Sequence, residues 1–311
     1  VLDLSNKAFL KTLRMLRIIA RRFFRGQKMG GRKTQRRGSS VEFSDYKQYN
    51  PGDDIRFIDW NIYGRLDRLL IKLFYNEENL STYVFLDCSN SMNFGTPSKF
   101  DYGRRLAAAI SYIAASNNDS VRVFCFNEGM KEYSPRADRA ARVMPLFRFL
   151  ENQEPGGRSD METAVQEFLA RFKKRGVVFV ISDFMLECKT KSEDQLPGGP
   201  PITNGWTRDG AIESSLKRLC YHKHDVNLIQ LLTPEEVDPA YAGLWEFTDS
   251  ETNEIKKIFI NNDVIQAYRD TLEDHFSKIS RFSNQNQIHY MRTLTDVPFE
   301  NLVLRLFSMN R

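Results

Sequence analysis

The fold of this chain is indicated by Tyr83-Val84-Phe85-Leu86-Asp87-Cys88-Ser89-Asn90-Ser91-Met92. The apolar half is typical of a buried strand, and the polar half places one carboxylate and two hydroxyls at alternate positions just after it. Oxygen ligands of this kind suit a hard divalent cation such as Mg²⁺ or Mn²⁺ and leave part of its coordination shell open. The alternative interpretation is a turn in which Asp87 and Ser89 only cap the next helix.

Two later segments add further oxygen ligands. Ser159 follows Gly156-Gly157, and Asp183 ends the apolar run over residues 176–182. In an open α/β sheet, ligands bind outside the carboxyl ends of the strands, where such loops converge. We therefore expect one metal site built from five oxygen-bearing side chains: Asp87, Ser89, Ser91, Ser159 and Asp183. Asp160 is expected to lie at a helix N-terminus and not to bind the metal directly.

These three loops resemble the metal-ion-dependent adhesion site of von Willebrand factor A domains. In that family the middle loop usually supplies Thr, whereas Ser159 stands at that position here and keeps the hydroxyl without the methyl. The resemblance implies a Mg²⁺ or Mn²⁺ ion, weakly held or absent. With only two carboxylates around it, such an ion keeps positive charge and can accept an acidic side chain of a partner protein.

A second block lies upstream of this strand: Tyr49-Asn50-Pro51-Gly52-Asp53-Asp54-Ile55-Arg56-Phe57-Ile58-Asp59-Trp60, preceded by Glu42-Phe43. It resembles domain-of-unknown-function family 58, proteins with a von Willebrand factor A-like domain often encoded beside MoxR-type AAA+ ATPases. The resemblance implies a bacterial protein that works with a MoxR-type ATPase on an unidentified protein client. Within the block we expect Arg56 and Asp59 to form a buried ion pair with Trp60 as an aromatic plug, and direct contact with a partner is the alternative.

Strand and helix patterns alternate along the chain. They predict an α/β fold, a von Willebrand factor A-like, doubly wound and mainly parallel sheet with helices on both faces. The expected strands are 82–87, 120–127, 176–182, 225–232 and 287–293, and the expected helices are 98–118, 139–152, 160–174, 211–222, 264–282 and 299–307.

Three domains are expected. Residues 1–37 read as a basic amphipathic helix and linker, 38–78 as a small β-rich module, and 79–311 as the von Willebrand factor A-like domain. That domain carries two insertions, a Pro- and Gly-rich loop near 187–210 and a hairpin near 243–260.

Charge is distributed unevenly. Residues 1–37 hold 12 Lys or Arg and one Asp, a net of +11, so the remainder sums to −6 because the whole chain carries +5. Over residues 7–25 basic and apolar side chains take opposite sides of a helix. Such a helix docks on the body of the protein, touches an anionic membrane surface or binds an acidic partner. Nucleic acid is not expected, because the basic cluster lacks interleaved aromatic residues.

Composition places the chain among globular proteins, with 41% hydrophobic and 27% charged residues. The longest uncharged run, residues 106–118, is shorter than the roughly 18 residues that a membrane helix needs. The cysteines show no Cys-x-x-Cys spacing, which predicts reduced thiols in the cytoplasm. They are Cys88, Cys125, Cys188 and Cys220.

Enzymatic function finds little support in the sequence. There is no Gly-x-x-x-x-Gly-Lys phosphate loop and no Gly-x-Ser-x-Gly elbow. A magnesium-dependent phosphohydrolase with Asp87 as nucleophile is the nearest rival. Phosphatases of the haloacid dehalogenase type place a second Asp two residues later, where this chain has Ser89. The sequence therefore favours a non-enzymatic protein-binding module, with a metal-independent structural adaptor as the alternative.

Overall fold

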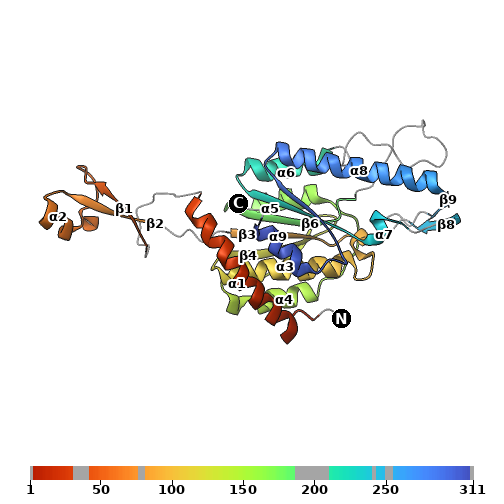
Figure 1. Cartoon of the computed structure of the whole chain (residues 1–311), viewed down its shortest axis with the longest axis horizontal. Coiled ribbons are helices and arrows are strands. Elements are labelled where there is room, and N and C mark those ends of the chain that lie inside the picture. Colours follow the sequence, from red (N-terminus) through yellow and green to blue (C-terminus); the bar gives the residue numbers. More distant parts are fainter. Residues whose placement is uncertain are drawn as a thin grey trace. The chain divides into compact units, whose positions relative to one another are not determined.

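The computed structural model describes residues 3–30, 42–75, 81–185, 210–239, 243–248 and 255–308. The chain forms two compact units (Figure 1). The larger unit comprises Val1–Phe23 and Leu80–Arg311, and the smaller one comprises Phe24–Asn79.

The larger unit is built on a six-stranded sheet of order β10-β7-β6-β3-β4-β5. All neighbouring strands are parallel except β4 and β5. This is the strand order of a doubly wound sheet, in which the winding reverses between β3 and β6, so the predicted fold class is confirmed. The strands are β3 (Ser81–Asp87), β4 (Ser120–Phe126), β5 (Met130–Tyr133), β6 (Gly176–Ser182), β7 (Asp225–Leu232) and β10 (His289–Leu294).

Helices cover both faces of this sheet (Figure 1). One face carries α1 (Lys7–Gly30), α3 (Lys99–Ser116), α4 (Met144–Glu151) and α9 (Phe299–Ser308), and the other carries α5 (Met161–Arg171), α6 (Ala211–Tyr221) and α8 (Asn262–Gln285). Short turns complete the unit: η2 (Asn90–Asn93), η3 (Ala140–Arg142) and α7 (Pro234–Val237).

Most predicted elements are present, but one predicted helix is divided and two short elements were not predicted. The helix expected over residues 139–152 is divided into η3 and α4. The sequence also did not indicate β5 and α7, each of only four residues. Elements this short hold too few side chains to show a period of two or 3.6.

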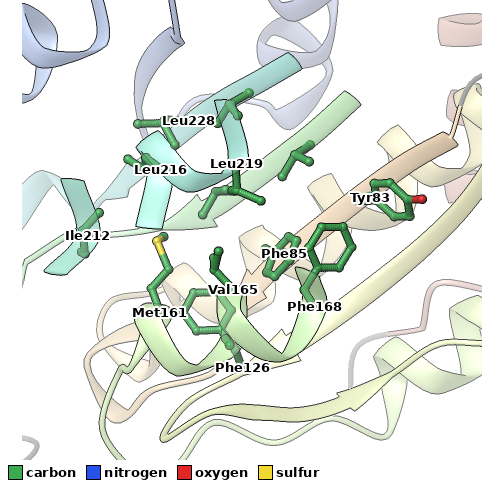
Figure 2. Close-up of a cluster of buried hydrophobic side chains, with 14 of the residues drawn as sticks. Tyr83, Phe85, Phe126, Met161, Val165, Phe168, Ile212, Leu216, Leu219 and Leu228 are labelled. Atoms are coloured by element: carbon green, nitrogen blue, oxygen red, sulfur yellow. The ribbon is translucent and has the colours of Figure 1, made fainter. Parts of the chain in front are cut away.

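The central strand β3 is buried at all seven positions. Burial on both faces explains why its sequence is nearly continuously apolar instead of alternating. On the α5 face, the rings of Tyr83 and Phe85 lie 4.9 and 5.1 Å from that of Phe168 (Figure 2). A one-residue slip would turn these rings to the other face, so the packing fixes the position of Asp87 at the strand's end.

The basic N-terminal helix docks on the larger unit over the part whose side chains are described, up to residue 18. Leu13 and Leu16 are buried, and the ring of Phe9 lies 6.3 Å from Phe147 and 5.6 Å from Phe299. The bases at positions 7, 11 and 14 are exposed. Docking is therefore confirmed for this part, while contact of residues 7–25 with a membrane stays a prediction.

The predicted hairpin is confirmed as an antiparallel pair of β8 (Gly243–Thr248) and β9 (Ile255–Ile260). The Pro- and Gly-rich loop predicted near 187–210 lies outside the described residues up to position 209. Within the described part of the chain, no helix has both the length and the apolar character needed to cross a membrane.

The smaller unit pairs β1 (Glu42–Gln48) with β2 (Leu70–Tyr75) in antiparallel fashion, and η1 (Ile55–Phe57) and α2 (Trp60–Leu66) lie between them in the chain. Asp59 is its buried carboxylate. Its side chain caps α2 by accepting hydrogen bonds from the backbone N–H groups of Asn61 and Ile62, and it also accepts one from the Tyr46 hydroxyl at 3.1 Å.

The prediction of a buried Arg56–Asp59 pair plugged by Trp60 is wrong. Arg56 pairs with Asp54 at 2.7 Å, and its side chain is 81% exposed. Trp60 is 61% exposed. Asp54, two residues before Arg56, pairs with the exposed guanidinium. Asp59 instead accepts hydrogen bonds from backbone N–H groups at the start of α2 and from the Tyr46 hydroxyl.

We expect Asp59→Ala to destabilise the smaller unit by about 0.5–2 kcal/mol, because it removes the N-cap of α2. Arg56→Ala is the matched control and should leave stability unchanged, because its ion pair is solvent-exposed. Hydrogen exchange of the α2 amides measures both variants. Equal loss of protection in the two would contradict the capping role of Asp59.

Candidate functional site

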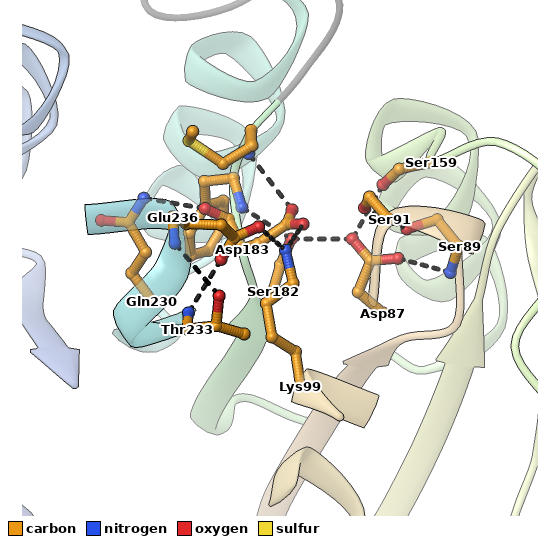
Figure 3. A network of polar contacts seen from close by, with 12 residues as sticks. Asp87, Ser89, Ser91, Lys99, Ser159, Ser182, Asp183, Gln230, Thr233 and Glu236 are labelled. Carbon is orange, nitrogen blue, oxygen red and sulfur yellow. Dashed lines mark hydrogen bonds and ion pairs between the residues drawn. The ribbon is translucent and has the colours of Figure 1, made fainter. Parts of the chain in front are cut away.

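A polar cluster lies at the carboxyl ends of β3 and β6, where the winding of the sheet reverses (Figure 3). Asp87 is its centre and is 1% exposed. One carboxylate oxygen accepts a hydrogen bond from the Ser89 backbone N–H at 2.9 Å. The other accepts from the hydroxyls of Ser159 at 2.9 Å and Ser182 at 2.7 Å. All three donors are neutral, so within the described part of the chain only dipoles solvate the charge of this buried carboxylate.

Backbone contacts bring the Ser159 loop to Asp87. The Gly156 N–H donates to the Cys88 carbonyl at 2.7 Å, and the Asn90 N–H donates to the Gly157 carbonyl at 3.0 Å. Gly157 has a φ of 77°, in the left-handed region that glycine adopts without strain. Asp160 caps α5 by accepting from the Thr163 N–H at 3.0 Å, as expected for a residue that does not bind the metal directly.

The two hydroxyls of the first loop also lie together. Ser89 is fully buried, and its Oγ lies 3.1 Å from that of Ser91 at the start of η2. Hydrogen bonds thus link Asp87 to Ser89 and Ser159 (Figure 3). A further hydrogen bond adds Ser91 to this cluster through Ser89. Four of the five predicted ligands therefore converge, although ligation of a metal by them stays a prediction.

Asp183, the fifth predicted ligand, is engaged differently. The ammonium of Lys99 lies 2.7 Å from Oδ2 of Asp183 and 2.5 Å from Oε1 of Glu236 (Figure 3). The Lys99 side chain is 1% exposed and that of Asp183 is 4% exposed. Asp183 thus already has a cationic partner supplied by this chain.

The pKa values of Lys99 and Asp87 are both raised, but for different reasons. Burial lowers the pKa of Lys99, but Asp183 and Glu236 raise it more, so the net pKa shift is upward and the ammonium stays charged. The pKa of Asp87 is raised to about 6, chiefly by burial and secondly by the Asp183 charge, and hydrogen bonds from Ser182 and Ser89 oppose this rise. Among the described residues, the site therefore holds three carboxylates against one ammonium.

This donor set fits a divalent cation at Asp87. A buried carboxylate without a cationic donor lies beside the hydroxyl oxygens of Ser89, Ser91 and Ser159, and oxygen is the ligand that Mg²⁺ and Mn²⁺ prefer. In the described parts of the chain no three His, Cys, Asp or Glu side chains form a metal-binding group. Ligation would therefore depend mainly on hydroxyls.

The sequence did not predict three residues of the site, namely Lys99, Ser182 and Glu236. Lys99 is the first residue of α3, where a positive charge opposes the helix dipole, and this unfavourable position was a usable signal. Glu236 forms a capping box with Thr233, a pattern readable from their spacing of three. No local pattern predicts that either one contacts Asp183.

Comparison with known proteins gives a family and distant relatives. The family model described as "Protein of unknown function DUF58" matches residues 45–278. The uncharacterised proteins Rv1480 of Mycobacterium tuberculosis and Mb1516 of Mycobacterium bovis are each 22% identical over 284 residues, covering 90% of this chain and 82% of theirs.

Solved structures also match over the larger part of the chain. BatB from Bacteroides thetaiotaomicron, a conserved hypothetical protein, is 14% identical with a TM-score of 0.43, and the match covers 74% of this chain and 98% of BatB. The SpRpn10 VWA domain is 10% identical with a TM-score of 0.39, covering 73% of this chain and 94% of that domain.

We expect Lys99→Met to lower the free energy of unfolding by about 3–5 kcal/mol in chelator, because it leaves two carboxylates in the buried network without their cation. Arg142→Met is the control, since Arg142 forms a surface pair with Asp138 and its side chain is 64% exposed. That change should cost less than about 1 kcal/mol. Urea unfolding measures both, and equal effects would contradict the burial of the Lys99 network.

Proposed function

This chain belongs to the DUF58 family of proteins of unknown function, and from the geometry of its own site we propose that it is a non-enzymatic protein-binding module. In this proposal a Mg²⁺ or Mn²⁺ ion binds at Asp87 with the hydroxyls of Ser89, Ser91 and Ser159. The remaining coordination position accepts a Glu or Asp side chain of a partner protein.

The observation that carries the proposal is the buried Asp87 carboxylate, whose hydrogen-bond donors among the described residues are all neutral. A buried carboxylate is costly unless a cation balances its charge. One carboxylate among hydroxyl ligands leaves a divalent ion with net positive charge, and this charge favours an acidic ligand from outside. Asp183 is less available to such an ion, because it already pairs with the ammonium of Lys99.

Binding suits this arrangement better than catalysis. A metal-dependent phosphohydrolase needs an acid or base beside its nucleophile to move a proton. The position two residues after Asp87 holds Ser89, whose hydroxyl does not supply a carboxylic acid, and Asp183 is engaged by Lys99. Both oxygens of Asp87 accept hydrogen bonds, which orients the carboxylate but also lowers its nucleophilicity.

We extend the proposal to the partners. A MoxR-type AAA+ ATPase and a protein client of that ATPase are the proposed ones, on the strength of the family resemblance in the upstream block. An exposed aromatic side chain beside the site supports a protein partner. Phe94, which follows η2 directly, is 46% exposed. An apolar contact at Phe94 would accompany the acidic side chain that binds the ion.

A metal-independent adaptor is the second candidate, and two observations favour it. Lys99 already supplies one cation to the site. Within the smaller unit, Ile55, Trp60 and Leu66 are 59%, 61% and 64% exposed. Large apolar side chains exposed on so small a module are typical of protein-binding surfaces. In this alternative the smaller unit binds the partner and the Asp87 cluster is structural.

Calorimetric titration with Mn²⁺ tests the ion. We expect the wild type to bind at millimolar concentrations or below, and Asp87→Asn to bind not at all, because the single uncompensated carboxylate is lost. Asp138→Asn, at a surface ion pair, is the control and should bind as the wild type does. In chelator, Asp87→Asn should melt no lower than the wild type, since it removes a buried charge. Absence of Mn²⁺ binding by the wild type favours the adaptor.

Capture of a purified MoxR-type ATPase from the same organism tests the use of the site. We expect capture with Mg²⁺ present and loss of capture in chelator or with Asp87→Asn. Capture that persists in chelator removes the metal from the mechanism. Metal-dependent hydrolysis of a phosphate monoester that disappears with Asp87→Asn would contradict the proposal and support a magnesium-dependent phosphohydrolase instead.

A further inference from the structure

We propose that the ammonium of Lys99 is a built-in cation that occupies a second cation-binding position, formed by Asp183 and Glu236. Its presence would confine an exchangeable divalent ion to Asp87 and the hydroxyls. This inference deepens the proposed function. The part that concerns the ion bound by the wild type rests on that function, whereas the second cation position rests on the contacts of Asp183 and Glu236.

The contacts of the two carboxylates point to a preformed cation position. Asp183 accepts a hydrogen bond from the Met185 N–H through Oδ1, at 3.2 Å, and contacts Lys99 through Oδ2. Glu236 accepts from the Thr233 N–H through Oε2, at 2.8 Å, and contacts Lys99 through Oε1. In each case a backbone N–H fixes one oxygen, and the other oxygen points at the same ammonium (Figure 3).

Further contacts, independent of Lys99, fix the backbone of the two residues that carry these carboxylates. The backbone carbonyl of Asp183 accepts from the Gln230 side chain at 2.7 Å. The Tyr268 hydroxyl donates to the Glu236 carbonyl at 2.6 Å, and the Thr233 hydroxyl accepts from the Glu236 N–H. Removal of the Lys99 charge would therefore leave two oriented carboxylate oxygens facing one position.

The chemistry of that position suits a divalent cation of the Mg²⁺ or Mn²⁺ class. Two carboxylates offer such an ion more negative charge than Asp87 and its hydroxyls do, and ligand charge is a main determinant of divalent affinity. The Coulombic effect of Asp183 on Asp87 shows that the two positions interact. A cation between Asp183 and Glu236, either ammonium or metal, therefore also reduces the repulsion felt by Asp87.

Lys99 thus decides how the site depends on metal. With the ammonium in place, the two carboxylates share one positive charge whether or not metal is present. Without it, stability should depend on an added ion, because no other cationic side chain among the described residues pairs with these two carboxylates. A purely structural lysine predicts the opposite, namely that Lys99→Met is destabilised equally with and without metal.

The test uses the full chain and three variants, with Mn²⁺ alone as the probe. Lys99→Met removes the ammonium, Lys99→Arg keeps the charge, and the triple variant Lys99→Met, Asp183→Asn, Glu236→Gln removes the charges of all three residues. Thermal melting in chelator and in millimolar Mn²⁺ is compared with calorimetric titration for each variant.

We expect Lys99→Met to bind Mn²⁺ roughly tenfold tighter than the wild type, or more, and to gain a rise in Tm on adding Mn²⁺ that exceeds the wild-type rise. Lys99→Arg and the triple variant should show no such gain. A Lys99→Met protein that gains no stability from Mn²⁺, whether it folds in chelator or not, overturns the proposal. An equal gain in the triple variant overturns it as well, because the carboxylates would then not be the ligands.

The same titrations separate this inference from the proposed function. If the wild type binds no Mn²⁺ but Lys99→Met does, the second cation position stands and the metal-dependent function at Asp87 fails. If the wild type binds Mn²⁺ and Lys99→Met binds no tighter, the proposed function stands and Lys99 is only structural.

Discussion

The buried ammonium of Lys99 is the interaction on which the polar edge of this protein depends. It joins the N-terminus of α3, the end of β6 and the turn α7 through contacts to Asp183 and Glu236. A charge removed from water must be paired, because the low dielectric of the interior makes an isolated ion far more costly than a surface one. Three segments distant in sequence are therefore held at one point, and the cluster around Asp87 forms beside it.

The apolar core determines where this polar edge lies. Aromatic rings of β3, β4 and α5 pack on one face of the sheet (Figure 2). The rings of Phe124 and Phe168, for example, lie 5.2 Å apart. Parallel pairing of β3 with both β4 and β6 then sets the ends of the strands at one edge. Because the core tolerates no slip in register, the carboxylates at those ends are placed without help from a ligand.

Two kinds of cation suit this edge, and they have different consequences. An ammonium belongs to the chain, is present in every folded molecule and makes the fold independent of metal. An exchangeable divalent ion can accept a ligand from another protein, because its shell is incomplete. In the proposed division of roles, Lys99 lies between Asp183 and Glu236 and stabilises the fold. The divalent ion at Asp87 then provides the open coordination position. The DUF58 family has no assigned activity, so this division is the specific hypothesis for this chain.

The sequence by itself determined the fold class, nearly all the strands and helices of the larger unit, and the convergence of Asp87 with Ser89 and Ser159. These features follow from local periodicity and from the rule that parallel strands end at one edge, and both can be read along the chain. The contact between Asp54 and Arg56 was also local, but it was missed because buried pairing with Asp59 was assumed. Only the tertiary structure decided the partner of Asp183. Lys99, Asp183 and Glu236 are far apart in sequence, and which charges meet in the interior depends on how α3 and α7 pack against the sheet, a property that no local pattern encodes.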